Sequence, residues 1–160
     1  MINVKVRVKY EISRNVFYRK GFKYQLTQVC IFQSSVYPPR NIITPFYEIN
    51  SNGIIIAKIG YAYDGASGPT FDSRCSMRPA LGHDVVYQAM REGLLDWHFK
   101  TAIDDNFYEW LIEDGMWKWR AQRWYDAVSK FGGTEKENPY KEFSAPNPNT
   151  TEPVKQIGGA

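Results

Sequence analysis

The hydrophobic pattern of this chain changes its period once, at the stretch DGASGPTFDS (64–73). Before this stretch, apolar and polar residues alternate, as in INVKVRVKY (2–10), and alternation is typical of a half-buried strand. After it, apolar residues recur at helical spacing. The glycines and proline of the stretch itself predict a loop. Because strands come first and helices follow, we expect an α+β fold.

Residues 1–62 predict an antiparallel β region. Its first strand is expected over 2–10 and its second over FKYQLTQVCIF (22–32). The segment SSVYPPRN (34–41) predicts a loop, because two prolines cannot join a strand ladder. The turn residues NSNG (50–53) lie between PFYEIN and GIIIAKIGYAY, which we interpret as the two strands of a hairpin.

Residues 63–132 predict three helices, over about 77–91, 96–114 and 117–131. Their ends are indicated by Ser76 as a cap with Pro79 in the first turn, by Asp96 and Gly115, and by Gly132 and Gly133. Their apolar positions are interpreted as core rather than as a ligand site: Ile103, Phe107, Trp110, Leu111, Trp119, Trp124, Val128 and Phe131.

Residues 133–160 are rich in Pro, Asn, Thr, Glu and Gly and have almost no apolar periodicity. Such a segment cannot bury enough apolar surface to offset its ordering cost. We therefore expect an extended C-terminal arm that is ordered against another chain of a large assembly. Its scattered apolar anchors are Tyr140, Phe143, Val154 and Ile157. Exposed strand edges in the β region could meet neighbouring chains in the same way.

The composition narrows the functional classes. The 160 residues fit one domain or one with an elaboration, and 20 basic against 17 acidic residues are too balanced to indicate nucleic-acid binding. The two cysteines form neither a disulfide framework nor a zinc motif. We find no apolar signal segment and no run long enough to span a membrane, so we expect a product made in the cytoplasm.

The segment RPALGHDVVYQAM (78–90) carries the strongest chemical signal. His83 and Asp104 are 21 residues apart, enough for one helix to end and a second to return beside it. A histidine held by a buried carboxylate is a general base with a fixed tautomer. The alternative is a buried hydrogen-bonded pair that only clamps two helices.

Asp84 and the Asp64–Gly65 loop could supply hard oxygen ligands, which suit calcium. Together with His83 they would make a water-activating site. The alternative for Asp64 is a turn residue that caps its own loop. A zinc site built on His83 and His98 lacks a paired-ligand motif.

The segments GHDVVYQAM, KTAIDDNFYEWL and RWYDAVSKFG resemble the prokaryotic branch of the phospholipase A2 superfamily. The matching elements are H-D-x-x-Y, then I-D-x-x-F-Y, then an aromatic ending with A-V-x-x-F-G. The chain is still more similar to an uncharacterised family of phage and prophage proteins marked by D-G-A-S-x-P, then H-D-x-x-Y, then an Asp-containing helix. The resemblance covers residues 64–132. The secreted enzymes hold their helices together with disulfides, and this chain lacks the cysteines for them.

The resemblance implies catalytic roles for three residues. His83 would activate water, Asp104 would orient it, and Tyr87 would hydrogen-bond Asp104. It also implies calcium ligation by Asp84, Asp64 and the Gly65 carbonyl.

Two functions follow as expectations. One is a calcium-dependent, phospholipase-A2-like hydrolase in the tail or neck of a phage particle, acting on host membrane phospholipid during entry. The other is a structural tail or adaptor protein of the virion without catalysis. In both, the protein is made in the host cytoplasm, joins the virion, and contacts other virion proteins through its arm and β edges.

Overall fold

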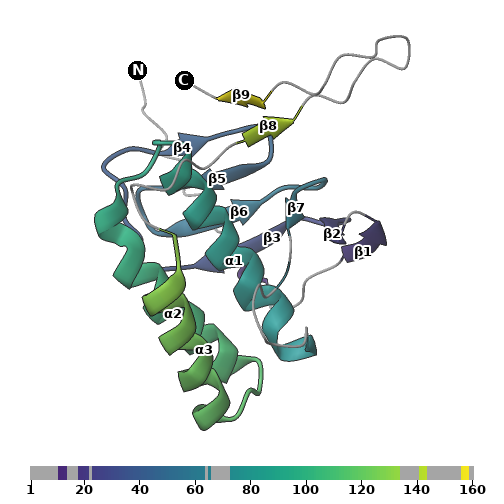
Figure 1. The fold of residues 1–160 in the computed structure, drawn as a ribbon, viewed down its shortest axis with the longest axis vertical. Coiled ribbons are helices and arrows are strands. Elements are labelled where there is room, and N and C mark those ends of the chain that lie inside the picture. Colours follow the sequence, from purple (N-terminus) through teal and green to yellow (C-terminus); the bar gives the residue numbers. More distant parts are fainter. Residues whose placement is uncertain are drawn as a thin grey trace, which may run out of the picture.

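The computed structural model describes residues 11–13, 18–21, 23–63, 65, 73–133, 141–143 and 156–158. Antiparallel strands are followed by three α-helices within these residues, which confirms the predicted α+β fold (Figure 1). The strand predicted over 2–10 lies outside the described residues.

The strands described before the helices form two antiparallel sheets. The larger has the order β3-β6-β5-β4, and the smaller has the order β1-β2-β7. The bounds of the larger sheet are β3 Cys30–Gln33, β6 Ile54–Ala57, β5 Tyr47–Ile49 and β4 Ile42–Ile43. Those of the smaller are β1 Tyr18–Gly21, β2 Lys23–Leu26 and β7 Ala62–Tyr63.

Two predicted strands are each interrupted where the chain leaves one sheet and joins the other. The prediction of one strand over 22–32 is wrong, because the ladder stops between Leu26 and Cys30. The segment 53–63 is likewise divided between β6 and β7. The Leu26 N–H donates to Tyr61 O and the Gly60 N–H donates to Leu26 O, both at 2.9 Å. These two bonds hold the break between β2 and β3 beside the break between β6 and β7.

The predicted hairpin between β5 and β6 is confirmed. Gly53 has a φ of 83°, a left-handed conformation that favours glycine. A Cβ at this position would also lie 2.5 Å from Ser34 O. The predicted loop 34–41 is also confirmed, because none of its residues belongs to a strand. Its Ser35 N–H and hydroxyl both donate to Asn106 Oδ1, at 2.8 and 2.9 Å.

All three predicted helices are present, as α1 Arg74–Arg91, α2 Lys100–Glu113 and α3 Lys118–Phe131. A short 3₁₀ turn, η1 Trp97–Phe99, precedes α2. The predicted start of the first helix is wrong: Ser73 is the N-cap, and Ser76 is already inside, with its hydroxyl accepting from the Ser73 N–H at 3.0 Å. Pro79 consequently lies in the helix interior rather than in the first turn.

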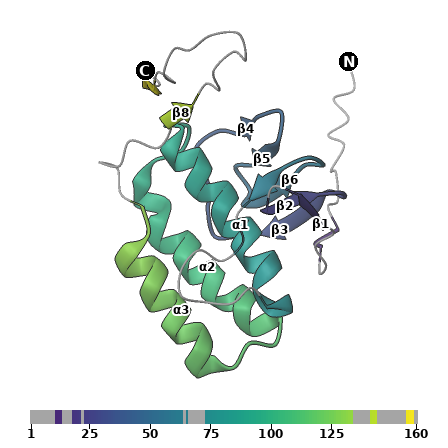
Figure 2. The same ribbon diagram turned by 45° about the vertical axis from the view of Figure 1, so that its right-hand side comes forward.

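Helix α1 lies between the larger sheet and the other two helices (Figures 1 and 2). One hydrophobic core joins the sheets to α1 and α2, with Phe32, Cys30 and Trp110 among its members. Gly82 lets α1 approach closely, because a Cβ there would lie 2.6 Å from the Trp110 ring and 3.0 Å from that of Phe32. A smaller cluster of Phe107, Leu111, Met116, Ala121 and Trp124 joins α2 to α3.

The prediction that Trp119 and Phe131 belong to the core is wrong. Trp119 is 59% exposed and Phe131 is 76% exposed. Only Ala121 and Trp124 of α3 are buried, because α3 packs on α2 along a single face. Trp119 lies off that face, and Phe131 is the last residue of the helix.

The predicted C-terminal arm is described at two short strands only, β8 Lys141–Phe143 and β9 Gln156–Gly158. They pair with one another in antiparallel register, Glu142 opposite Ile157. The strands therefore form a local pair where we expected a segment extended along another chain. The remaining residues of 134–160 lie outside the described part, and the predicted partner chain stays a prediction.

Candidate functional site

Asp104 is the centre of the candidate site. Its Oδ1 atom lies 2.9 Å from His83 Nε2 and accepts a hydrogen bond of 2.9 Å from the Tyr87 hydroxyl. His83 and Tyr87 are one turn apart on α1, and Asp104 is on the first turns of α2, which runs antiparallel to α1. The predicted contact between His83 and Asp104 is therefore confirmed, and so is the predicted bond from Tyr87.

Lys100, which we did not predict from the sequence, completes the site. Its ammonium donates to Asp104 Oδ2 at 2.7 Å. It also donates to two carbonyl oxygens near the end of α3, those of Ser129 at 3.1 Å and Val128 at 3.3 Å. The available signal was the spacing of Lys100 and Asp104, four residues apart on a predicted helix. The site thus joins all three helices of the described chain.

Burial and pairing set the protonation of the site. Asp104 is 1% exposed; burial works to raise its pKa, but hydrogen bonds from His83 and Lys100 outweigh it and hold the pKa below the usual value. His83 is 8% exposed, and burial lowers its pKa against the opposing effect of Asp104. Burial also raises the pKa of Tyr87, and the negative charge of Asp104 adds to the effect. The resting state is therefore an ionised Asp104 beside a neutral His83.

The hydrogen bonds fix the tautomer of His83. An ionised carboxylate can only accept, so His83 Nε2 must carry the proton that it shares with Asp104. The lone pair of the neutral ring then lies on Nδ1. Among the described residues Nδ1 has no hydrogen-bond partner. The His83 side chain keeps 10% of its surface exposed, and Nδ1 is the ring nitrogen left to act as a base.

Aromatic rings hold the imidazole in place. The His83 ring stacks on Tyr87 with centroids 4.1 Å apart and contacts Phe107 at 4.9 Å. A Cβ at Gly132 would lie 2.5 Å from the Tyr87 hydroxyl. Gly132 therefore provides the room that this hydroxyl needs to reach Asp104.

The predicted calcium ligands are only partly covered by the structure. Asp84 is half-buried on α1, and Gly65 is buried with a φ of 71°. Asp64 lies outside the described residues. Within the described ranges, no three His, Cys, Asp or Glu side chains gather into a metal-binding group. Calcium ligation by Asp84, Asp64 and the Gly65 carbonyl therefore stays a prediction.

The two histidines have different partners, Asp104 for His83 and Asp96 for His98. His98 is exposed on η1, where its Nδ1 lies 2.7 Å from Asp96 Oδ1 and its backbone N–H donates to the same oxygen at 2.8 Å. These bonds cap η1 and lower the pKa of Asp96.

No helix in the described part of the chain has the length and apolarity needed to cross a membrane. The sequence matches no protein-family model, no curated protein and no solved structure significantly.

Proposed function

We propose that this protein is a hydrolase of carboxylic esters, similar in chemistry to phospholipase A2, that is carried in a phage particle and uses His83 as its base. The observation that carries the chemistry is the pairing of His83 Nε2 with Asp104, which leaves the lone pair on Nδ1 of a side chain that keeps 10% of its surface exposed. The phage setting and the lipid substrate rest on the sequence resemblance.

The residues would act in the following order. His83 Nδ1 takes a proton from water as the oxygen attacks the ester carbonyl carbon. Asp104 stabilises the imidazolium that forms, and Tyr87 and Lys100 keep the carboxylate oriented. The imidazolium returns the proton to the leaving alcohol as the carbon–oxygen bond breaks. Water and ester thus give acid and alcohol, and no covalent enzyme intermediate forms.

The test compares the two histidines of the chain. Fatty-acid release from mixed phospholipid vesicles is measured for the parent, His83→Gln and His98→Gln, with calcium and with a chelator. We expect His83→Gln to lose roughly 100-fold or more in rate, the usual contribution of a general base, and His98→Gln to retain the parent rate. The resemblance to phospholipase A2 predicts loss of activity in the chelator as well.

The opposite result would support a structural virion protein. One observation favours this second function: every oxygen of the Asp104 carboxylate is already bonded, and the network ties α1, α2 and the end of α3 together. A network of this kind stabilises helix packing without any reaction. If no sample shows lipolysis, or if the parent and His83→Gln have equal rates, the structural function is the one that remains.

A further inference from the structure

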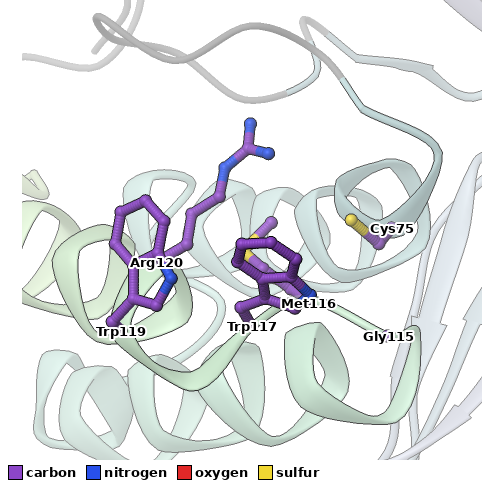
Figure 3. Close-up of a pocket in the computed structure, with 6 residues that line it drawn as sticks. All are labelled: Cys75, Gly115, Met116, Trp117, Trp119 and Arg120. Atoms are coloured by element: carbon purple, nitrogen blue, oxygen red, sulfur yellow. The ribbon is translucent and has the colours of Figure 1, made fainter.

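A cavity of about 310 Å³ opens where the start of α3 faces the start of α1 (Figure 3). Its lining consists of Cys75, Gly115, Met116, Trp117, Trp119 and Arg120. The network around Asp104 shares none of these residues. Its volume is at the lower end of the range for ligand pockets, which is enough for one or two apolar side chains.

The cavity is bordered by two exposed indoles. Trp117 is 73% exposed and Trp119 is 59% exposed, and their ring centroids are 6.4 Å apart. Figure 3 shows the Arg120 side chain rising between them. Tryptophan is the residue whose exposure leaves the largest apolar area in contact with water. Two neighbouring exposed tryptophans beside a hollow therefore mark an apolar surface whose burial against a partner would lower the free energy.

The same surface carries cations that the described chain does not neutralise. Lys118, Arg120 and Arg123 make no ion pair with any carboxylate of the described residues. Arg120 instead lies over the Trp124 ring, 5.8 Å from its centroid. By contrast, the buried Arg78 is paired with Asp114 at 2.7 Å. Lys118 and Arg120 are adjacent to Trp119 in the sequence and Arg123 is one turn further along α3, so the start of this helix offers a partner positive charge beside the indoles.

We propose that this surface binds an acidic segment of a partner protein, which inserts one apolar side chain into the cavity that Trp117 and Trp119 border. Trp, Met and Arg are the residues enriched in protein interfaces and in their energetic hot spots. The cations around the indoles complement acidic residues on either side of the inserted one. A hollow suits an inserted side chain better than it suits a membrane, where tryptophans have to protrude. The proposal goes beyond the proposed hydrolase and does not depend on it.

A random peptide library displayed against the full-length protein tests the proposal. We expect the enriched peptides to carry an aromatic or aliphatic residue flanked by Asp and Glu. The affinity of one synthesised peptide should fall roughly tenfold or more when its apolar residue becomes serine, as for loss of an aromatic anchor. It should also fall with added salt.

The matched variants are on one helix. Trp117→Ser with Trp119→Ser should abolish peptide binding, and Arg120→Gln with Arg123→Gln should weaken it. Phe131→Ser with Lys130→Gln is the control, because it removes an equally exposed aromatic ring and the cation 5.3 Å from that ring's centroid, at the far end of α3. Circular dichroism checks that each variant is folded.

Three outcomes would overturn the proposal. The first is an absence of acidic peptides among those enriched, and the second is equal binding by the tryptophan variant and the control. The third is tryptophan-dependent binding to vesicles of anionic phospholipid without peptide binding, which would assign the surface to a membrane instead.

Discussion

Asp104 can stay ionised inside the protein because each of its oxygens receives a donor, and one of these donors is a cation. Lys100 supplies the charge, while His83 and Tyr87 supply neutral donors. A buried carboxylate that loses such a partner is strongly destabilised. Lys100 is therefore the residue on which the stability of this site depends most directly.

We expect Lys100→Met to lower the free energy of unfolding by about 2–3 kcal/mol, below the full value for a buried pair because the lysine side chain is partly exposed. Urea unfolding followed by fluorescence measures this change. The control is Lys130→Met, which removes an exposed lysine of α3 and should alter stability by less than about 0.5 kcal/mol. Equal urea midpoints for the two variants would contradict the role of Lys100.

The stability should also depend on pH in a defined direction. Burial lowers the pKa of His83 from its ordinary 6.5, so the unfolded chain binds this proton more readily. Stability from His83 is thus present above pH 6.5 and is lost as the pH falls below it. Asp104, whose pKa is also lowered from 3.8, adds a second loss below pH 3.8.

Urea midpoints measured from pH 8 to pH 3 test this prediction. We expect the parent to lose stability in both intervals and His83→Gln to lose it only in the lower one. A parent midpoint that stays constant between pH 7 and pH 4.5 would show that His83 is not held neutral by burial.

Spacing along the sequence was sufficient to predict the contact of His83 with Asp104, because two antiparallel helices joined by a short turn bring such positions together. It was not sufficient for the contacts of Lys100 with Ser129 and Val128, since these depend on where a third helix ends. The predicted metal role of Asp64 stays a prediction, because this residue lies outside the described ranges.

At the scale of the element, α1 approaches the rings of Trp110 and Phe32 closely at Gly82. We expect Gly82→Ala to destabilise the protein by about 1–2 kcal/mol, because the new methyl group overlaps the Trp110 ring and only part of the cost is offset by the better helix propensity of alanine. Trp110→Phe removes the overlapping ring atoms. In a double-mutant cycle, Gly82→Ala should therefore cost less in the Trp110→Phe background. Strict additivity would mean that the two residues do not compete for space.

The helices were predicted more closely than the strands, and the reason is physical. A helix is specified by neighbours three and four residues away, so its pattern lies within one segment. The ends of β2 and β3 are instead set by which distant strand each one joins, β7 or β6. No local feature of residues 22–32 reveals that change of partner. The exposure of Trp119 and Phe131 escaped prediction similarly, because it depends on how far α2 covers α3.

At the scale of the whole molecule, the two sheets and the helices α1 and α2 share one hydrophobic core. We expect a single cooperative unfolding transition in which far-ultraviolet circular dichroism and tryptophan fluorescence have the same midpoint. The core residues Phe32 and Trp110 come from the two sides of the boundary near residue 62. Two separate transitions would indicate that the β region folds independently of the helices.

The cavity beside α3 also makes the unmodified protein suitable for spectroscopy. Burial raises the pKa of the Cys30 thiol to about 12, and this side chain is enclosed in the core, so thiol reagents will not reach it in the folded state. Cys75 is only half-buried and lines the cavity. A single maleimide dye or nitroxide can thus be attached next to Trp117 without engineering, which places a reporter where a bound partner would change its environment.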